Sequence, residues 1–181
     1  MPSWPVIARR IRVPSSFALT AVYLWLARPD VRSLTIGAFF IVAGLLIRGV
    51  ASGHLDKNEQ LATTGPYAYT RNPLYVGSLV MAIGFAIAAR SLWIALALIA
   101  MFAAIYLPVI YAEESYLSQR FPEFAEYARR VPRFVPTLSR FTSKHGSFSW
   151  NLYWKHREYN ATLGSAAVLA VLLVKLLWSP R

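Results

Sequence analysis

Two groups of polar residues interrupt the apolar runs of this 181-residue chain. The first is the stretch 64–77, which contains three tyrosines, an arginine and an asparagine. The second is the carboxylate pair Glu113 and Glu114. Ionisable groups at membrane depth are costly and therefore indicate a functional site. The alternative is that both glutamates are solvated residues just beyond a helix end, paired with nearby arginines such as Arg129 or Arg133.

The spacing between the two groups predicts that they meet on one side of a membrane. The 35 residues between Gly77 and Glu113 carry a single charge, Arg90, near their middle. Two spans of roughly 17–20 apolar residues, joined by a short turn at Arg90, fit this interval. The chain would leave one membrane face near Tyr75 and return to the same face at Glu113.

Composition supports a membrane protein. The chain is 56% hydrophobic with a mean hydropathy of +0.42, which is too apolar for a soluble domain of this length. The net charge of +11 raises the possibility of nucleic-acid binding, but the basic residues lie between apolar runs, as in the loops of membrane proteins. The chain has no cysteine, which excludes disulfides, thiolate metal sites and cysteine nucleophiles.

Five apolar runs predict an all-α integral membrane protein with about five transmembrane helices. The runs cover residues 13–27, 33–47, 73–89, 92–112 and 160–174. The first two have only 15 residues each, so snorkelling arginines and local thinning would have to complete them. Residues 49–72 are predicted to form the first substantial loop. Pro108 is expected to disturb the fourth helix near the carboxylates.

The basic residues predict the orientation. With the N-terminus inside, the inner face holds 14 of them: Arg9, Arg10, Arg12, Arg48, Lys57, Arg71, Arg120, Arg129, Arg130, Arg133, Arg140, Lys144, Lys155 and Arg157. The outer face holds four, Arg28, Arg32, Arg90 and Arg181, while Lys175 snorkels from the last span. This bias predicts a multi-pass protein whose site faces the cytoplasm.

The segment after Glu114 is predicted to be a short helix over 121–130 with an aromatic face, followed by an extended stretch through 131–136. Residues 143–159 mix tryptophan and tyrosine with basic residues, which is typical of a membrane interface. Metal binding is not expected, because His54, His145 and His156 lie in loops without ligand spacing. Glycine-rich phosphate-binding and nucleophile-elbow motifs are absent from the sequence.

Several motifs in order resemble the isoprenylcysteine carboxyl methyltransferase family, within the wider phospholipid methyltransferase group. They are Gly-Pro-Tyr at 65–67, Arg-Asn-Pro-Leu-Tyr-x-Gly at 71–77, the two glutamates after a helical hairpin, the aromatic stretch 121–127 and Arg-Val-Pro at 130–132. The resemblance covers about residues 30–137. The family pattern has histidine where this chain has Asn72, and asparagine cannot titrate near neutrality.

The resemblance implies a membrane enzyme that transfers a methyl group from S-adenosylmethionine. The implied cofactor-binding residues are Tyr67, Arg71, Asn72, Pro73, Leu74, Tyr75, Gly77 and Glu113. Carboxylates suit the positive sulfur and ammonium of this cofactor, tyrosines can stack or hydrogen-bond, and Gly77 would let a ligand approach closely. The implied catalytic residues are Glu114 and Arg130, the latter holding an acceptor carboxylate by its planar fork.

The sequence therefore predicts one membrane domain over 1–181, with a methyltransferase-like core at about 30–137 and an interfacial segment plus final helix at 138–181. The predicted function is S-adenosylmethionine-dependent methylation of a lipophilic acceptor, foremost a prenylcysteine-type carboxylate. The expected partners are that acceptor and membrane lipids, with no nucleic acid or metal. The alternatives are N-methylation of a phospholipid amine, a sterol-type reductase using NADPH, and a non-enzymatic membrane protein.

Overall fold

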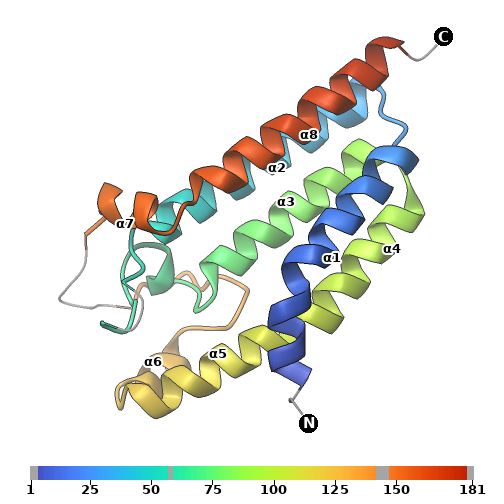
Figure 1. Cartoon of the computed structure of the whole chain (residues 1–181). Helices are drawn as coiled ribbons and strands as arrows, with labels where there is room; N and C mark the ends of the chain where they lie inside the picture. The colour runs from blue at the N-terminus through green and yellow to red at the C-terminus, as the bar shows by residue number, and fades with distance from the viewer. Residues whose placement is uncertain (1–3, 57–58, 142–146, 179–181) are drawn as a thin grey trace. The chain divides into compact units, whose positions relative to one another are not determined.

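The computed structural model describes residues 4–56, 59–141 and 147–178. All regular structure in these ranges is helical. The helices are α1 (Trp4–Leu26), α2 (Val31–Ser52), α3 (Pro73–Ala89), α4 (Leu92–Met101), α5 (Leu107–Arg120), α6 (Phe124–Arg130), α7 (Trp150–Lys155) and α8 (Tyr159–Trp178) (Figure 1). A 3-10 turn forms at Gly65–Ala68, and a π-helical turn, Phe102–Tyr106, joins α4 to α5. Lys57, Lys144 and Arg181 of the charge count, and His145, lie outside the described residues.

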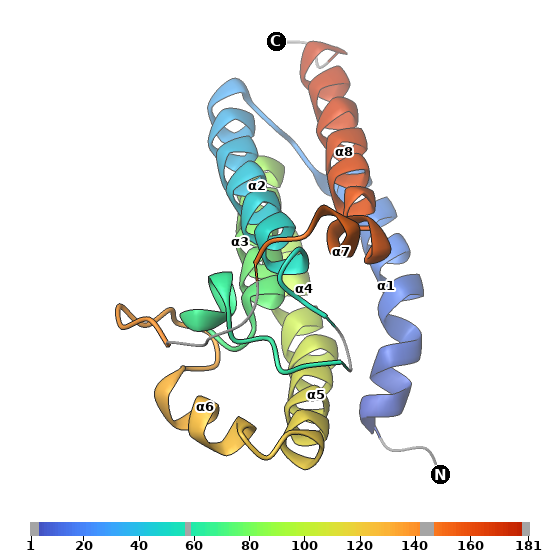
Figure 2. The same ribbon diagram turned by 90° about the vertical axis from the view of Figure 1, so that its left-hand side faces the viewer.

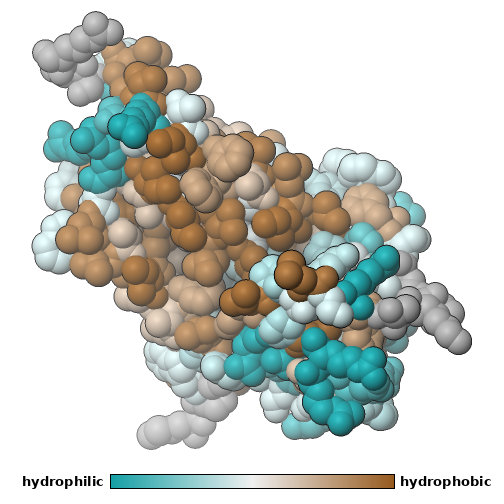
Figure 3. Space-filling view, turned by 180° about the vertical axis from the view of Figure 1, so that it is seen from behind, coloured by the Kyte–Doolittle hydropathy of each residue, from teal (hydrophilic) through white to brown (hydrophobic). Residues whose placement is uncertain are grey.

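Three helical stretches among the described residues are long and apolar enough to cross a membrane. They are Val31–Ser52, the continuous run Leu92–Arg120 and Tyr159–Trp178. The other two predicted spans are also helical, but their apolar parts, Pro14–Leu26 and Pro73–Ala89, are shorter. The all-α prediction is confirmed, and the predicted five spans are supported for three. Hydrophobic residues form a broad continuous area on the face shown in the space-filling view (Figure 3).

The end of α2 corrects the predicted loop over 49–72. The helix continues to Ser52 and so reaches 22 residues, which removes the shortage of length expected for the second span. Ala51 and Ser52 are fully buried, and the Ser52 hydroxyl donates to the Gly49 carbonyl. Burial of the last turn keeps these small and polar residues helical despite their weak helix propensity.

The chain forms two compact units. The first is built from residues up to Ile41, from Ala82–Glu114 and from Gly164 onward. The second is built from Val42–Met81 and Ser115–Leu163. Each unit therefore draws on segments that are distant in the sequence.

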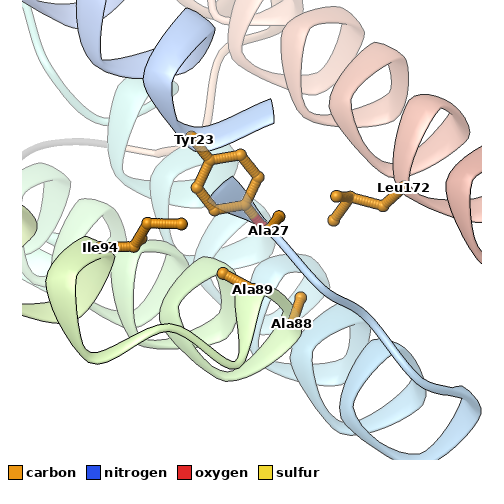
Figure 4. Packing of buried hydrophobic residues seen from close by; sticks show 6 residues of the cluster. All are labelled: Tyr23, Ala27, Ala88, Ala89, Ile94 and Leu172. Carbon is orange, nitrogen blue, oxygen red and sulfur yellow. The ribbon is translucent and has the colours of Figure 1, made fainter. Parts of the chain in front are cut away.

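The core of the first unit contains side chains from α1, α3, α4 and α8 together with the residue after α1. Its buried members are Tyr23, Ala27, Ala88, Ala89, Ile94 and Leu172 (Figure 4). The Tyr23 hydroxyl donates to the Phe85 carbonyl over 3.0 Å, so this polar group has a partner within the apolar core. Gly37 and Gly84 bring α2 and α3 together here, since a Cβ on Gly37 would lie 2.6 Å from the Gly84 carbonyl oxygen.

Polar groups close the helix ends of the first unit. Asp30 caps α2: its carboxylate accepts from the Ser33 N–H over 2.7 Å, and its own N–H donates to the Ser33 hydroxyl. Asp30 also pairs with Arg90, which lies in the predicted turn between α3 and α4. Lys175 donates to the Leu24, Trp25 and Ala27 carbonyls, three acceptors at the end of α1. Lys175 thus caps the end of α1, and its predicted snorkelling stays a prediction.

The π-helical turn lies just before Pro108, where a disturbance of the helix was expected. Proline has no N–H to donate to the Ala104 carbonyl four residues earlier. The Trp4 indole N–H donates to that carbonyl over 3.0 Å instead. The first turns of α1 run beside α4 and the π-helical turn, where Ala8, Ile105 and Val109 form a small buried cluster (Figure 1).

The second unit has its own aromatic core. Phe124, Tyr127 and Val131 are buried, and the partly buried Leu61, Leu117, Phe121, Ala128 and Phe141 pack against them. The predicted aromatic face of the 121–130 segment is therefore a packing face. Its helix, α6, is shorter than expected and begins at Phe124, where the chain turns back after α5 (Figure 2).

Candidate active site

The signature loop, which we define as residues 64–72, belongs to the second unit. Its 3-10 turn begins at Gly65, whose φ of +57° lies in the left-handed region that glycine adopts most readily. A Cβ at this position would also meet the His54 ring at 2.6 Å. Tyr67 and Ala68 are buried, and the turn ends at Tyr69, whose N–H donates to the Pro66 carbonyl. Backbone geometry and packing thus fix the start of this loop.

The end of the signature loop starts α3. The Asn72 carbonyl accepts from the N–H groups of Tyr75 and Val76, so it makes the first hydrogen bonds of the helix. Pro73 occupies the first helical position, where its missing N–H costs nothing, and it is fully buried. Among the remaining predicted site residues of this stretch, Arg71, Leu74 and Tyr75 are partly buried.

Residues 131–141, here called the strap, run along the signature loop. The Arg71 N–H donates to the Pro132 carbonyl, and the Thr137 N–H donates to the Tyr69 carbonyl, each over 2.9 Å. The Thr70 hydroxyl and the Asn72 amide both donate to the Arg133 carbonyl, over 3.0 and 3.3 Å. Backbone and side-chain bonds therefore hold the strap and the loop together within the second unit.

The aromatic core supports the same loop from α6. The Tyr127 hydroxyl donates to the Tyr67 carbonyl over 2.8 Å in a buried position. Tyr127 also contacts Phe124 and Phe141 edge to face, with ring centroids 6.2 and 5.4 Å apart. Tyr67, predicted to bind the cofactor, thus has its backbone fixed by the α6 core.

Arg130, the predicted anchor for an acceptor carboxylate, lies in the last turn of α6. Its guanidinium pairs with Glu126 one turn earlier at 2.8 Å, and its side chain is 67% exposed. Arg130 thus already holds a carboxylate, although on a surface where such pairs contribute little stability.

Glu113 and Glu114 belong to the first unit, where they lie inside α5 and not beyond its end. The helix continues for six residues after Glu114, to Arg120, which corrects the alternative of a solvated pair past a helix end. Glu114 is buried, with 7% of its surface exposed, while Glu113 is partly buried. Attraction between opposite charges is stronger where water is largely excluded, so Glu114, the more buried of the two, is the stronger candidate for binding a cation.

Sequence reasoning missed a buried ion pair beside the start of α3. The Arg48 Nε and Nη2 atoms donate to the two carboxylate oxygens of Glu158 over 2.6 and 3.0 Å. The Nη1 atom donates to the Ser78 hydroxyl and to the Leu74 carbonyl. Arg48 was counted only as an inner-face charge. The position of Arg48 in the sequence does not reveal this contact, because its partner lies 110 residues away.

Gly77 has a packing role in the structure. A Cβ on Gly77 would lie 2.6 Å from the Arg48 Cγ and 2.8 Å from the Gly44 carbonyl oxygen of α2. The absence of a side chain at position 77 therefore lets α2 and α3 approach each other closely in the second unit. Its predicted contact with a ligand stays a prediction.

No group of three or more histidine, cysteine, aspartate or glutamate side chains is placed to hold a metal ion in the part of the chain that the structure describes. His54 instead contacts the Phe148 ring and the Val50 carbonyl. The carboxylates of Asp56 and Glu158 are paired with Lys155 and Arg48.

Two curated proteins with metal-resistance names are similar to this chain. The nickel-cobalt-cadmium resistance protein NccN of Alcaligenes xylosoxydans is 44% identical over 102 residues, which cover 53% of this chain and 48% of that protein. The cobalt-zinc-cadmium resistance protein CzcN of Cupriavidus metallidurans is 42% identical over 97 residues, covering 54% and 44%. The chain thus spans about half the length of these relatives. No solved structure matches it.

A comparison with protein families matches residues 16–123 to the family described as phospholipid methyltransferase. The match includes the signature loop, the start of α3 and the two glutamates, while Arg130 and the strap lie beyond its end. It covers more than half of the chain and agrees with the wider group that the sequence motifs indicate. This chain belongs to the phospholipid methyltransferase family.

Proposed function

We propose that this protein is an integral-membrane methyltransferase that uses S-adenosylmethionine to methylate a lipophilic acceptor. Membership of the phospholipid methyltransferase family carries the proposal. The signature loop supports it, because the strap and the α6 core hold its backbone in one conformation. A preorganised loop can position a cofactor without first losing conformational freedom.

The residues fit the charges of this cofactor. S-adenosylmethionine supplies an electrophilic methyl group on a positive sulfur and carries an ammonium group. Glu114 carries a carboxyl group in a buried position. It can bind one of these positive groups there with little competition from water. We propose that Glu113 and Glu114, and separately Tyr67, Arg71, Asn72 and Tyr75, contribute to binding it. Pro73, Leu74 and Gly77 would shape the helix start that carries them.

Cofactor binding is tested with radiolabelled S-adenosylmethionine on the detergent-solubilised protein. Loss of one charge-assisted hydrogen bond costs roughly 1.5–3 kcal/mol, so Glu114→Gln should weaken binding about 10- to 150-fold. Glu123→Gln, which alters an exposed carboxylate, is the matched control. Wild-type affinity in Glu114→Gln would remove this glutamate from the site. Binding of NADPH in place of the cofactor would favour the reductase alternative.

For the acceptor we propose a carboxylate, as in prenylcysteine methylation, held by Arg130. A carboxylate is ionised at neutral pH and needs no general base before it attacks the methyl group. The Arg130–Glu126 pair supports this role, because a substrate carboxylate could replace the exposed Glu126 in the same geometry. Arg130→Ala should abolish turnover while preserving cofactor affinity, and lysine should not rescue it, because it lacks the planar fork. Glu126→Gln, which frees Arg130, should keep turnover.

The family description supports a second acceptor, the amine of a phospholipid. An amine must lose a proton before methyl transfer, and a glutamate could accept it. The two acceptors give products that differ chemically, since a methyl ester releases methanol in alkali and an N-methyl group does not. Labelled methyl groups that survive alkali would overturn the carboxylate assignment and leave the methyltransferase proposal intact.

We propose that the site faces the cytoplasm, on the basis of 14 inner and four outer basic residues. Five spans would place the N-terminus inside and the C-terminus outside. Reporter fusions at the two ends test this arrangement. Both reporters on one side would refute it.

The names of the two relatives support a physiological proposal, that methylation by this protein contributes to metal tolerance. The test is growth of a metal-sensitive bacterial host on nickel, cobalt and cadmium. The wild-type chain should raise tolerance and Glu114→Gln should not. Equal tolerance with the wild-type protein and with Glu114→Gln would show that methylation does not contribute to metal resistance.

A further inference from the structure

The tip of the strap exposes apolar side chains outside any helix. Val135 is 77% exposed and Leu138 is fully exposed. Exposed leucine and valine on the long helices are explained by lipid tails, but the strap belongs to none of the helices that could cross a membrane. Two such residues within four positions of an irregular segment indicate that another surface covers them.

Basic residues flank Val135 and Leu138 in the sequence. The chain has no aspartate or glutamate between Glu126 and Glu158, and this interval contains seven lysines and arginines. Arg129 lies just before the strap, Arg133 lies within it and Arg140 lies near its end; the first and last of these are exposed. A surface that complements the tip must therefore be anionic and must accept apolar side chains at the same place.

We propose that the strap docks on the anionic phospholipids of the membrane surface. Val135 and Leu138 would enter the boundary between headgroups and acyl chains, while the arginines bind phosphate groups. A basic segment with an apolar tip matches the two attractions that hold peripheral segments on anionic membranes. The same compact unit also exposes Trp150 and Trp154 of α7, a residue type enriched at membrane interfaces.

Docking of the strap would also affect the signature loop, because the two segments are joined by hydrogen bonds. Thr137, between the two exposed side chains, is hydrogen-bonded to Tyr69, and Arg133, just before them, accepts hydrogen bonds from Thr70 and Asn72. A lipid contact that restrains the strap would therefore further restrain this loop. The inference goes beyond the proposed function, since the lipids here serve as a docking surface whether or not they are methylated.

The natural absence of cysteine makes the depth of the tip measurable in the full chain. Leu138→Cys carries a nitroxide spin label, and Glu123→Cys is the control at an exposed position of the same unit. The protein is reconstituted into vesicles of phosphatidylcholine, with or without phosphatidylglycerol. Oxygen concentrates among acyl chains, whereas a water-soluble nickel chelate stays outside. Collision rates with both reagents then report the depth of each label, independently of methyl transfer.

We expect the oxygen-to-nickel collision ratio at position 138 to exceed that at position 123 several-fold when phosphatidylglycerol is present. Arg129→Gln with Arg140→Gln should lower the ratio at 138 and remove its dependence on phosphatidylglycerol. A nickel-accessible label at 138 in both kinds of vesicle would overturn the proposal by placing the tip in water. Dipolar broadening between labels on different chains would overturn it by showing that a second copy covers the tip. A label at Val135→Cys should repeat the result at 138.

Discussion

Glu158→Gln should destabilise the protein far more than a single surface substitution normally does. The Glu158 side chain is 9% exposed, and both of its oxygens accept from Arg48. Glutamine keeps the shape but supplies only one accepting oxygen and no charge. Arg48 would then be a partly buried cation that keeps its bonds to Ser78 and the Leu74 carbonyl and at most one bond to the glutamine oxygen, with no negative charge beside it.

The expected loss of stability in Glu158→Gln depends on how deeply Arg48 and Glu158 are buried. Removing one partner of a buried ion pair typically costs 3–5 kcal/mol, because the other charge stays in a poorly solvated place. The Arg48 side chain is 23% exposed, so water can reach part of it and the lower end applies. We expect a loss of about 3 kcal/mol. For a chain of this length that corresponds to a fall in the unfolding midpoint of about 6–12 °C.

Thermal unfolding in detergent, followed by circular dichroism at a fixed scan rate, measures this fall. Asp56→Asn is the matched control, since it breaks the Lys155–Asp56 pair, whose 3.7 Å separation and exposed lysine predict less than about 1 kcal/mol. Arg48→Met combined with Glu158→Met should be more stable than either single variant, because no buried charge is left alone. A midpoint for Glu158→Gln equal to that of Asp56→Asn would refute the reasoning.

Three further predictions concern the helices. Gly77→Ala should cost about 1–3 kcal/mol, because its Cβ would overlap α2. Gly164→Ala, with no atom within 4 Å of the new Cβ, should be neutral or stabilising in the same unfolding assay. Lys175→Met should lower the free energy of unfolding by about 2–3 kcal/mol, since three carbonyls lose their donor, and Lys175→Arg should lose less. The Ser33 N–H, with help from Arg90 and Arg32, holds the pKa of Asp30 below its usual value. The resulting stabilisation is present above the pKa of aspartate in the unfolded chain and is lost as pH falls through the lower pKa of folded Asp30. In unfolding measured against pH, the wild-type protein should show this loss of stability in acid, and Asp30→Asn should not.

The helices could be predicted from sequence where hydropathy alone determines them. The run 73–89 coincides with α3, and the charge at Arg90 marks the turn that follows it. The prediction failed at the end of α2, where Gly49 and Ser52 look like loop residues but are held helical by burial. Local propensity could not reveal this, because the stabilisation comes from segments far along the chain.

The sequence motifs identified some residues of the candidate site but not the contacts that hold them. Buried Tyr67, Asn72 and Glu114 stand at positions that the motifs single out. The ion pair of Arg48 with Glu158 and the bonds between the strap and the loop join residues about 60 to 110 positions apart. A single sequence shows each partner as an ordinary polar residue, since neither spacing nor hydropathy records which distant group it will contact.

Residues 71–77 have a structural role in addition to their proposed role in cofactor binding, and the two roles must be separated to interpret any variant. Asn72 donates to the strap, Pro73 begins α3, and Gly77 lets α2 pack closely against α3. Each of these residues therefore stabilises the fold, whatever the protein binds. Substitutions at these positions would impair activity through folding even if no cofactor touched them. Glu114 is different, because it lies inside a continuous helix and glutamine can replace it without altering the helix. A cofactor assay at Glu114, with unfolding measured beside it, therefore tests the chemistry of the site more directly than any change within the motif.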